Sequence, residues 1–490
     1  MIKIKIITLF FLTAVSLGTI SSCTEGFEEM NINPNQSSKA LPETLLAPAI
    51  TDMVKRNLDR AMRLNNELMQ VHVARTDGDQ IHRYVIRSAE SDYMWNNWYT
   101  ELTNFRDIYT SAEETQTAQT PTYKGISLIC EVWVMSLLTD MFGDVPYSEA
   151  NRGREGLLQP KFDKQEEIYA QLFHRLEEAN TLLKTNVNLT AVQTVSDPIY
   201  QGVASNWRRF GNSLYLRLLL RVSGKSEPVA EGMTPIEKFA QIVANPDEYP
   251  LMSNNAQSAI LKFTGTVPYQ STFHTWRIPD FNGFHSLSTF FVNNLIENND
   301  PRIVKWATLS EGVFSGIPSG YAVGQVPRAA STYNTALMTE PLLGNIMNYA
   351  ELQFILAEAA AKGWIPVSAK TFYETGVQNA ITLWGLTVPT NYLTQEGIKF
   401  EDNYTLEAKM NLIHLQKYYT LFFTDFQQWY EYRRTGLPNL PKGPGLQNNA
   451  QMPARFNYPV YVQSLNQQNY TAAVADQGPD NINTKVWWQQ

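Results

Sequence analysis

The fold is decided by the stretch NYAELQFILAEAAAKGWIPVSAKTFYETGVQNAITL, residues 348–383. Its first half carries apolar residues three and four positions apart, which is the spacing of one helix face: Leu352, Ile355, Leu356 and Ala359. Gly363 is typical of a helix end, and a second helix is predicted over 368–383. Two helices joined by a short turn, about 34 residues in all, predict a hairpin of the tetratricopeptide type.

Degenerate versions of this hairpin are predicted at 121–141 with 164–186 and at 404–419 with 421–434. Other helices are predicted by the same periodicity, over 43–75, over 91–113 and from Asp197 onward. Asp163 and Glu166 have the spacing of a capping box for the helix at 164–186.

The composition changes between about 224 and 345, where Gly, Pro, Asn, Ser and Thr are frequent and apolar runs are short. This pattern predicts long loops with brief strands, and helices only near 234–245 and 286–297. After Gly436, repeated prolines predict an irregular tail. The fold class is therefore mostly α, with tetratricopeptide-like helical hairpins supporting an irregular, loop-rich region with short strands.

The N-terminus has the order of a secretory signal. Lys3 and Lys5 precede an apolar run over 6–17, and small residues lead to Cys23. The tetrad ISSC that ends at Cys23 resembles a lipobox, so residues 1–22 are expected to be a signal peptide and Cys23 to be lipidated. The alternatives are a spanning anchor or an ordinary signal. Removal of 1–22 takes away two lysines and no acid, which changes the net charge from −8 to −10.

The composition restricts the class of protein. A hydrophobic content of 43% supports a large core. With Cys23 assigned to the lipid, Cys130 has no partner for a disulfide and is expected to be a buried small hydrophobe. The acidic balance and the absence of a basic stripe argue against nucleic acid. The apolar run at 126–142 contains Glu131 and Asp140, so it predicts a core helix.

Several short segments, in a fixed order along nearly the whole chain, resemble the SusD/RagB family of Bacteroidetes outer-membrane nutrient-binding lipoproteins, and especially its SusD-like branch. These segments are Cys23 with Asn33-Pro34-Asn35, Phe142-Gly143-Asp144-Val145-Pro146-Tyr147, Phe162-Asp163, Trp207 with Asn212-Ser213-Leu214, Ile355-Leu356-Ala357-Glu358-Ala359, Trp429 with Arg433-Arg434-Thr435-Gly436, Pro453 with Arg455, Tyr458-Pro459 and Trp487-Trp488.

The resemblance implies tetratricopeptide-like helix pairs that support a looped ligand-binding region. It also implies a role without catalysis or a cofactor. Members lie as a lid over a TonB-dependent SusC-like barrel transporter, bind glycans or in some cases peptides, and help deliver them to the barrel. The resemblance places the protein at the outer membrane, lipid-anchored and exposed on the cell surface. Residues 23–42 are then a tether, and 43–490 a single SusD-like domain.

A sugar-binding site needs exposed aromatic faces beside Asn, Asp, Arg or His. One stretch within the loop region supplies both kinds of side chain: Trp276, Arg277, Asp280, Phe281, Asn282, Phe284 and His285. Pro279 and Gly283 within it predict a loop. Aromatic residues in loops often fold back onto the core, and that alternative stays open. Trp276 is favoured as a ligand contact because Thr275 and Arg277 flank it.

Trp95 and Asn96 form a second candidate site. Trp95 shares helical spacing with Trp98 and Leu102, which favours core packing, whereas Asn96 is expected to point outward. No metal site is predicted. The sequence ArgThrAspGlyAsp at 75–79 lacks the remaining ligands of a calcium loop.

An exported glycosidase is the rival class, and a lid that contacts only the transporter is a third. The chain contains no HExxH zinc helix, no GxSxG elbow and no phosphate-binding glycine loop. A helix-rich pattern also disfavours the eight-fold barrel common among hydrolases. The sequence therefore favours a non-catalytic binding protein.

Overall fold

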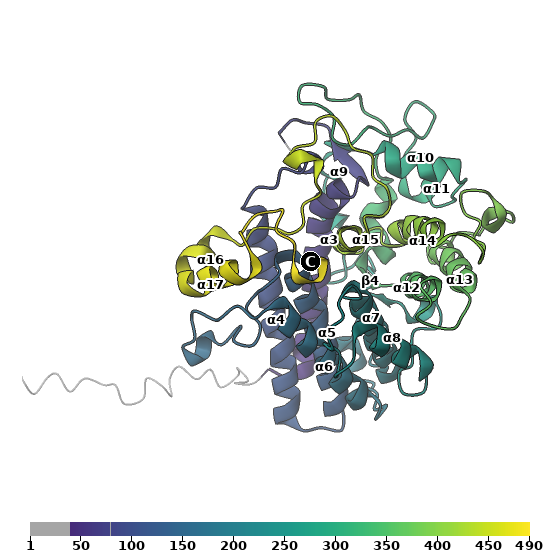
Figure 1. The fold of residues 1–490 in the computed structure, drawn as a ribbon. Coiled ribbons are helices and arrows are strands. Elements are labelled where there is room, and N and C mark those ends of the chain that lie inside the picture. Colours follow the sequence, from purple (N-terminus) through teal and green to yellow (C-terminus); the bar gives the residue numbers. More distant parts are fainter. Residues whose placement is uncertain (1–39, 79) are drawn as a thin grey trace, which may run out of the picture. The chain divides into compact units, whose positions relative to one another are not determined.

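The computed structural model describes residues 40–78 and 80–490. The signal peptide, Cys23 and most of the tether lie outside these residues. Residues Leu41–Gln490 form one compact unit. Its helices are arranged around two regions, an N-terminal layer and a C-terminal hairpin region, with irregular loops above them in Figure 1.

The N-terminal layer is built from five long helices, each packed against the next along the chain: α3 (Pro42–Leu68), α4 (Glu90–Thr115), α5 (Thr120–Phe142), α6 (Gln165–Leu183) and α7 (Ala204–Arg221). Among the described residues, only α5 is long and apolar enough to span a membrane, and its apolar window is entirely buried. A helix that is apolar on every face belongs in a core, as the sequence predicted for 126–142.

The deciding hairpin is formed as predicted. α12 (Tyr349–Ala361) packs against α13 (Ala369–Thr382), and α14 (Leu406–Thr420) packs against both. Side-chain caps define both starts of the hairpin, because Asn348 accepts from Glu351 N and Ser368 accepts from Thr371 N. α15 (Gln427–Thr435) begins at Gln427 rather than near 421 as predicted. It packs against α3 and does not form the predicted hairpin with α14.

Two predicted helix boundaries were wrong, the end of α3 and the start of α7. α6 starts within one residue of the prediction but lacks the predicted cap. α3 ends at Leu68, and the chain then turns at Gln70 (φ 54°) into a strand. Asp163 is no cap, since its carboxylate accepts from the backbone of Tyr147 and Ser148. Asp197 accepts from Gly202 N and from Trp207 Nε1, so it organises a turn and α7 starts only after it.

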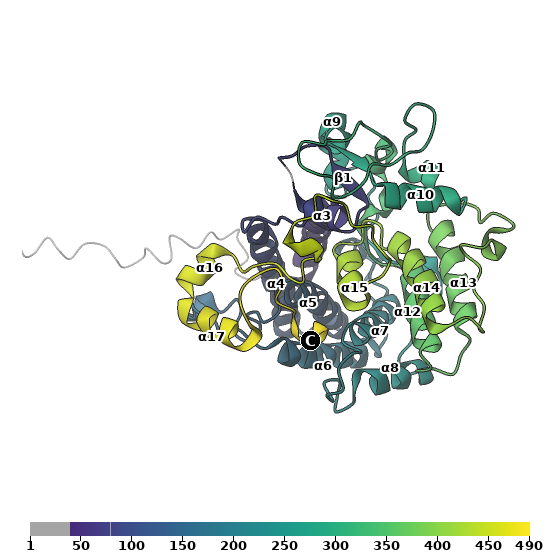
Figure 2. The same ribbon diagram turned by 45° about the horizontal axis from the view of Figure 1, so that its top comes forward.

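The loop region contains short helices. Four short strands occur among the described residues, and one of them, β1, lies outside this region, shortly after α3. β1 (His72–Ala74) pairs antiparallel with β3 (His285–Leu287), and β2 (Ala259–Ile260) pairs antiparallel with β4 (Asn345–Met347). The helices are α8 (Pro235–Ala244), α9 (Ile278–Asn282), α10 (Thr289–Glu297) and α11 (Ile303–Trp306). β1 and α9 lie above α3 in Figure 2.

Short 3-10 turns connect many of these elements: Ile81–Arg83, Gly153–Glu155, Thr194–Ser196, Asn255–Gln257, Thr272–Thr275, Thr335–Thr339, Pro341–Gly344, Tyr392–Thr394, Asn448–Ala450 and Trp487–Gln489. The tail after Gly436 is not wholly irregular, because α16 (Val460–Leu465) and α17 (Gln467–Gln477) follow Pro459. Both Figures 1 and 2 show this pair beside α4.

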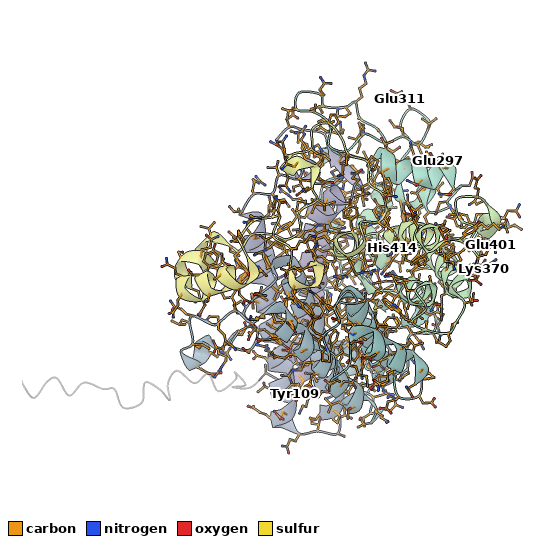
Figure 3. All side chains as sticks on the ribbon, viewed as in Figure 1. Tyr109, Glu297, Glu311, Lys370, Glu401 and His414 are labelled. Carbon is orange, nitrogen blue, oxygen red and sulfur yellow. The ribbon has the colours of Figure 1, made fainter. Side chains whose placement is uncertain are left out.

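A buried ion network joins the hairpin region to α15. The guanidinium of Arg434 donates to both oxygens of Glu358, at 2.7 Å each, and to Glu431 at 2.8 Å. Lys417 pairs with the same Glu431 at 2.8 Å, and His414 lies 3.5 Å from Glu358. His414 lies in the interior in Figure 3. Lys362 and Arg221 also pair with these carboxylates, so four cations already compensate them and this cluster is a structural crosslink rather than a metal site.

Candidate functional site

A hollow of about 370 Å³ opens where the end of α3 meets β1, α9 and β3. Here it is named the histidine hollow, and its lining residues are Asp59, Arg60, Met62, Arg63, Glu67, His72, Ala74, Thr76, Trp276, Asp280, Phe284 and His285. Side chains of both charges, aromatic rings and imidazoles therefore converge on one space. This combination suits a ligand with many hydroxyl groups and apolar ring faces.

α3 supplies one wall of the hollow. Arg60, Arg63 and Glu67 recur every three or four positions and share one helix face, and Asp59 lies next to Arg60. Neighbouring side chains hold the arginines in place. The Arg60 guanidinium lies 4.0 Å from the ring centroid of Tyr93, and Arg63 donates to the Glu90 carboxylate at 2.9 Å. This wall therefore presents fixed donors to the hollow.

Two stacked imidazoles, from the paired strands β1 and β3, form the floor. The rings of His72 and His285 lie 4.3 Å apart and within 24° of parallel. The Tyr333 hydroxyl accepts from Asn66 Nδ2 at 3.0 Å and shares a hydrogen bond of 2.7 Å with His72 Nδ1, which holds this ring in place. Nε2 of His285 is buried and has no partner among the described residues. The floor therefore holds an unused polar atom.

The imidazoles of the floor are neutral at physiological pH. Burial, together with the nearby guanidinium of Arg75, lowers the pKa of His285 to about 4. Burial and the facing ring of His285 hold the pKa of His72 well below its ordinary value. A neutral imidazole donates from one nitrogen and accepts at the other, which suits a hydroxyl ligand.

Aromatic side chains form the outer wall. Trp276 is half-buried, with its ring edge-on to Phe273 at 5.0 Å, and Phe284 is 66% exposed. Between them, Asp280 accepts two hydrogen bonds of 2.7 Å from Arg277. Apolar ring surface and polar groups therefore alternate along this wall.

The structure brings together four of the seven residues predicted in this stretch, namely Trp276, Asp280, Phe284 and His285. Phe281 has no exposed surface, since it packs between Phe273 and Tyr333, so its assignment as a ligand contact is corrected. Asn282 donates to the Tyr333 carbonyl at 2.8 Å and has a structural role. Arg277 is 81% exposed and reaches the hollow only through Asp280. The stretch is also not a plain loop, because it forms α9 and the start of β3.

Sequence reasoning missed the contribution of α3 and β1. Arg60, Arg63 and His72 lie about two hundred positions before Trp276, and only the pairing of β1 with β3 brings them together. The one available signal was the helical spacing of charged residues near the end of α3, and exposed helix faces show the same pattern.

The second predicted pair lies elsewhere. Trp95 is 7% exposed and packs edge-on against Phe142 and Tyr458, as the core interpretation predicted, yet one part of it lines a hollow of about 240 Å³. Asn96 points outward and its Oδ1 accepts from the Tyr461 hydroxyl at 2.6 Å. It holds α16 against α4 and does not reach the histidine hollow.

The SusD-like family described as "Starch-binding associating with outer membrane" matches residues 34–459. The chain belongs to the SusD-like family. The match covers most of the chain, as expected from the order of the short sequence segments. No match to this sequence was found among curated proteins.

Solved structures of SusD-like proteins share the fold. A SusD homologue from Bacteroides fragilis is 24% identical, with 92% of this chain and 100% of that chain covered at a TM-score of 0.78. A chitin-binding SusD homologue from Flavobacterium johnsoniae is 21% identical, with 92% and 98% covered at 0.79. A SusD-like protein from Bacteroides thetaiotaomicron is 21% identical, with 91% and 98% covered at 0.76. These likenesses confirm the predicted helical fold class.

Proposed function

We propose that this SusD-like protein captures an oligosaccharide in the histidine hollow and delivers it to a TonB-dependent SusC-like transporter in the outer membrane. The observation that carries the proposal is the alternation of Trp276 and Phe284 with Asp280 and His285 around one hollow. The apolar face of a sugar ring packs on an aromatic ring, while its hydroxyls bond to the neighbouring polar groups.

The comparisons support a glycan ligand. The family description names starch, and one structural neighbour is a chitin-binding protein. Both are polymers of uncharged pyranoses. The histidine hollow suits such a ligand, because Asp280 is neutralised by Arg277 and both floor imidazoles are uncharged.

We propose that the protein binds without catalysis. Glycosidases use two carboxyl groups, one of which is a general acid with a raised pKa. Asp280, the carboxyl beside Trp276 and Phe284, lacks this property, since its hydrogen bonds with Arg277 hold its pKa below the ordinary value. On the facing wall, burial raises the pKa of Asp59. Released reducing sugar after incubation with glycol chitin or starch would contradict the non-catalytic role.

The test is affinity electrophoresis of the protein in gels that contain glycol chitin or starch. Phe284→Ala and Trp276→Ala are expected to weaken retardation about tenfold or more, because each removes a stacking surface worth about 1.4 kcal/mol or more. Phe284 is exposed, so its variant should keep the thermal midpoint, whereas Trp276→Ala also loses its contact with Phe273.

Leu309→Ala is the matched control, since Leu309 is 58% exposed in the same loop region but does not line the hollow. It should migrate like the unmodified protein. Equal retardation of all three variants would show that the glycan binds elsewhere.

A further inference from the structure

A small cavity lies in the core between α3, α5, the start of β4 and the link that joins α14 to α15. It is named the core cavity, and its lining residues are Val54, Asn57, Leu58, Trp133, Leu343, Asn345, Ile346, Phe423 and Asp425. Eight of these nine residues are buried, and Asn345 is half-buried. The cavity has a volume of about 10 Å³, close to the smallest volume that admits one water molecule.

Asn57 supplies a hydrogen-bond donor at the α3 wall of the core cavity. Its Oδ1 accepts from Trp98 Nε1 at 2.7 Å. An indole nitrogen can only donate, so this bond fixes the orientation of the amide. The other group of the amide, Nδ2, is buried and has no partner among the described residues. The α3 wall therefore offers N–H groups.

Asn345 and Asp425 supply acceptors. Asn345 Nδ2 donates to Thr424 Oγ1 at 2.6 Å, whereas its Oδ1 is buried and has no partner in the described part of the chain. Asp425 Oδ1 accepts from Gln427 Nε2 at 3.0 Å, but its Oδ2 lies 3.5 Å from Trp133 Nε1, at the limit of a hydrogen bond. Burial raises the pKa of Asp425 to about 6, so at pH 7 this carboxyl is mostly ionised and accepts.

The chemistry of these groups defines what can occupy the core cavity. Buried polar groups in proteins are almost always hydrogen-bonded. An occupant that satisfies this set must accept from Asn57 and Trp133 and donate to Asn345 and Asp425. A metal ion cannot accept from the two N–H groups, and an apolar group satisfies none of the four. Water does both, and a buried water typically makes two to four such bonds.

We propose that the core cavity binds one ordered water molecule, which accepts from Asn57 Nδ2 and Trp133 Nε1 and donates to Asn345 Oδ1 and Asp425 Oδ2. The water then joins four segments that are far apart in sequence. One of them needs support, because Phe423 and Asp425 in the link between α14 and α15 have positive φ angles of 58° and 36°, which are unfavourable for residues other than glycine. The core cavity shares no residue with the histidine hollow, so this site does not depend on the glycan proposal.

The first test is a high-resolution crystal structure of the protein. One solvent peak is expected in the core cavity, about 2.7–3.2 Å from Asn57 Nδ2, Asn345 Oδ1 and Asp425 Oδ2. Ordered side chains with no peak between them would overturn the proposal. A peak about 2.3–2.6 Å from the oxygens and remote from Asn57 Nδ2 would also overturn it, because those are the distances of a bound cation.

Val54→Ile tests the same site by displacement. The added methyl group should exclude the water and leave its polar partners unsatisfied, so the equilibrium constant for unfolding should rise about tenfold or more. In a dry cavity the same methyl group would fill unused space and stabilise the fold. Urea denaturation measures the change, and Val304→Ile is the matched control, because Val304 is 60% exposed and its variant should keep the midpoint. An unchanged or lower unfolding constant for Val54→Ile, or a water peak that persists in its crystal structure, would contradict the proposal.

Discussion

At the scale of single residues, the stacked pair His72 and His285 makes the free energy of unfolding depend on pH. The folded protein keeps His285 neutral down to a pKa of about 4, whereas an unfolded chain protonates a histidine near its ordinary value of about 6.5. Between these values the unfolded state binds more protons, so the contribution of His285 to stability falls as the pH falls.

We therefore expect the difference in unfolding free energy between the unmodified protein and His285→Gln to decrease from pH 7 to pH 4, by up to about 3 kcal/mol. The measurement is urea denaturation at several pH values. Taking the difference between two proteins cancels the opposite contribution of buried carboxyls such as Asp425, whose pKa burial raises to about 6. A difference that stays flat with pH would show that His285 is protonated in the folded state.

Single residues also show what sequence can and cannot predict about the site. Trp276 was predictable because its neighbours are polar, and the structure places it on the hollow. Phe281 has an equally polar neighbour in Asn282, yet it is buried. The sequence could not predict this, because α9 is only about one turn long and too short to show a helical periodicity. Arg60 and His72 became site residues only through a strand pairing between distant segments.

At the scale of elements, Arg434 joins α15 to α12 through Glu358, and Lys417 joins α14 to α15 through Glu431. The side chain is buried, and it neutralises Glu358 and Glu431, both of which are buried as well. The guanidinium of Arg434 holds the pKa of both carboxyls below the ordinary value against the effect of burial. Without the arginine, Glu358 keeps its ion pair with Lys362 and Glu431 keeps those with Lys417 and Arg221, but each buried carboxylate loses one cationic partner.

Arg434→Ala is therefore expected to lower the unfolding free energy by about 3–5 kcal/mol at pH 7, the typical cost of breaking a buried ion pair. Urea denaturation followed by circular dichroism measures it. Arg277→Ala is the control, because Arg277 forms an exposed ion pair with Asp280. This substitution should leave the urea midpoint unchanged. A similar, small effect for both variants would contradict the role of Arg434 as a crosslink.

The elements that sequence predicted well are those whose periodicity is long. The hairpin of α12 and α13 was predicted within a residue or two, because its apolar stripe and polar caps agree. The predicted cap at Asp163 and the predicted helix start at Asp197 failed, since an aspartate that could cap a helix bonds equally well to a neighbouring turn. The pairing of α15 with α3 also had no local signal.

At the scale of the whole molecule, α3 and the loop region together build the histidine hollow. If the protein binds without catalysis, as we propose, it acts by where it holds its ligand. This requirement gives the predicted lipid anchor at Cys23 a functional purpose, although that residue lies outside the described part of the chain.

Cys23→Ala is expected to separate binding from uptake. A protein without the lipid should still be retarded in a glycan gel, because the histidine hollow begins at Asp59, well after the anchor. Cells that carry this variant should fail to grow on the glycan, since a soluble protein is no longer concentrated beside the transporter. The measurement compares growth on the glycan and on its monosaccharide, with immunoblots of membrane and medium. Normal growth with the variant found in the medium would show that anchoring is dispensable, and loss of gel retardation would show that the substitution damages the fold.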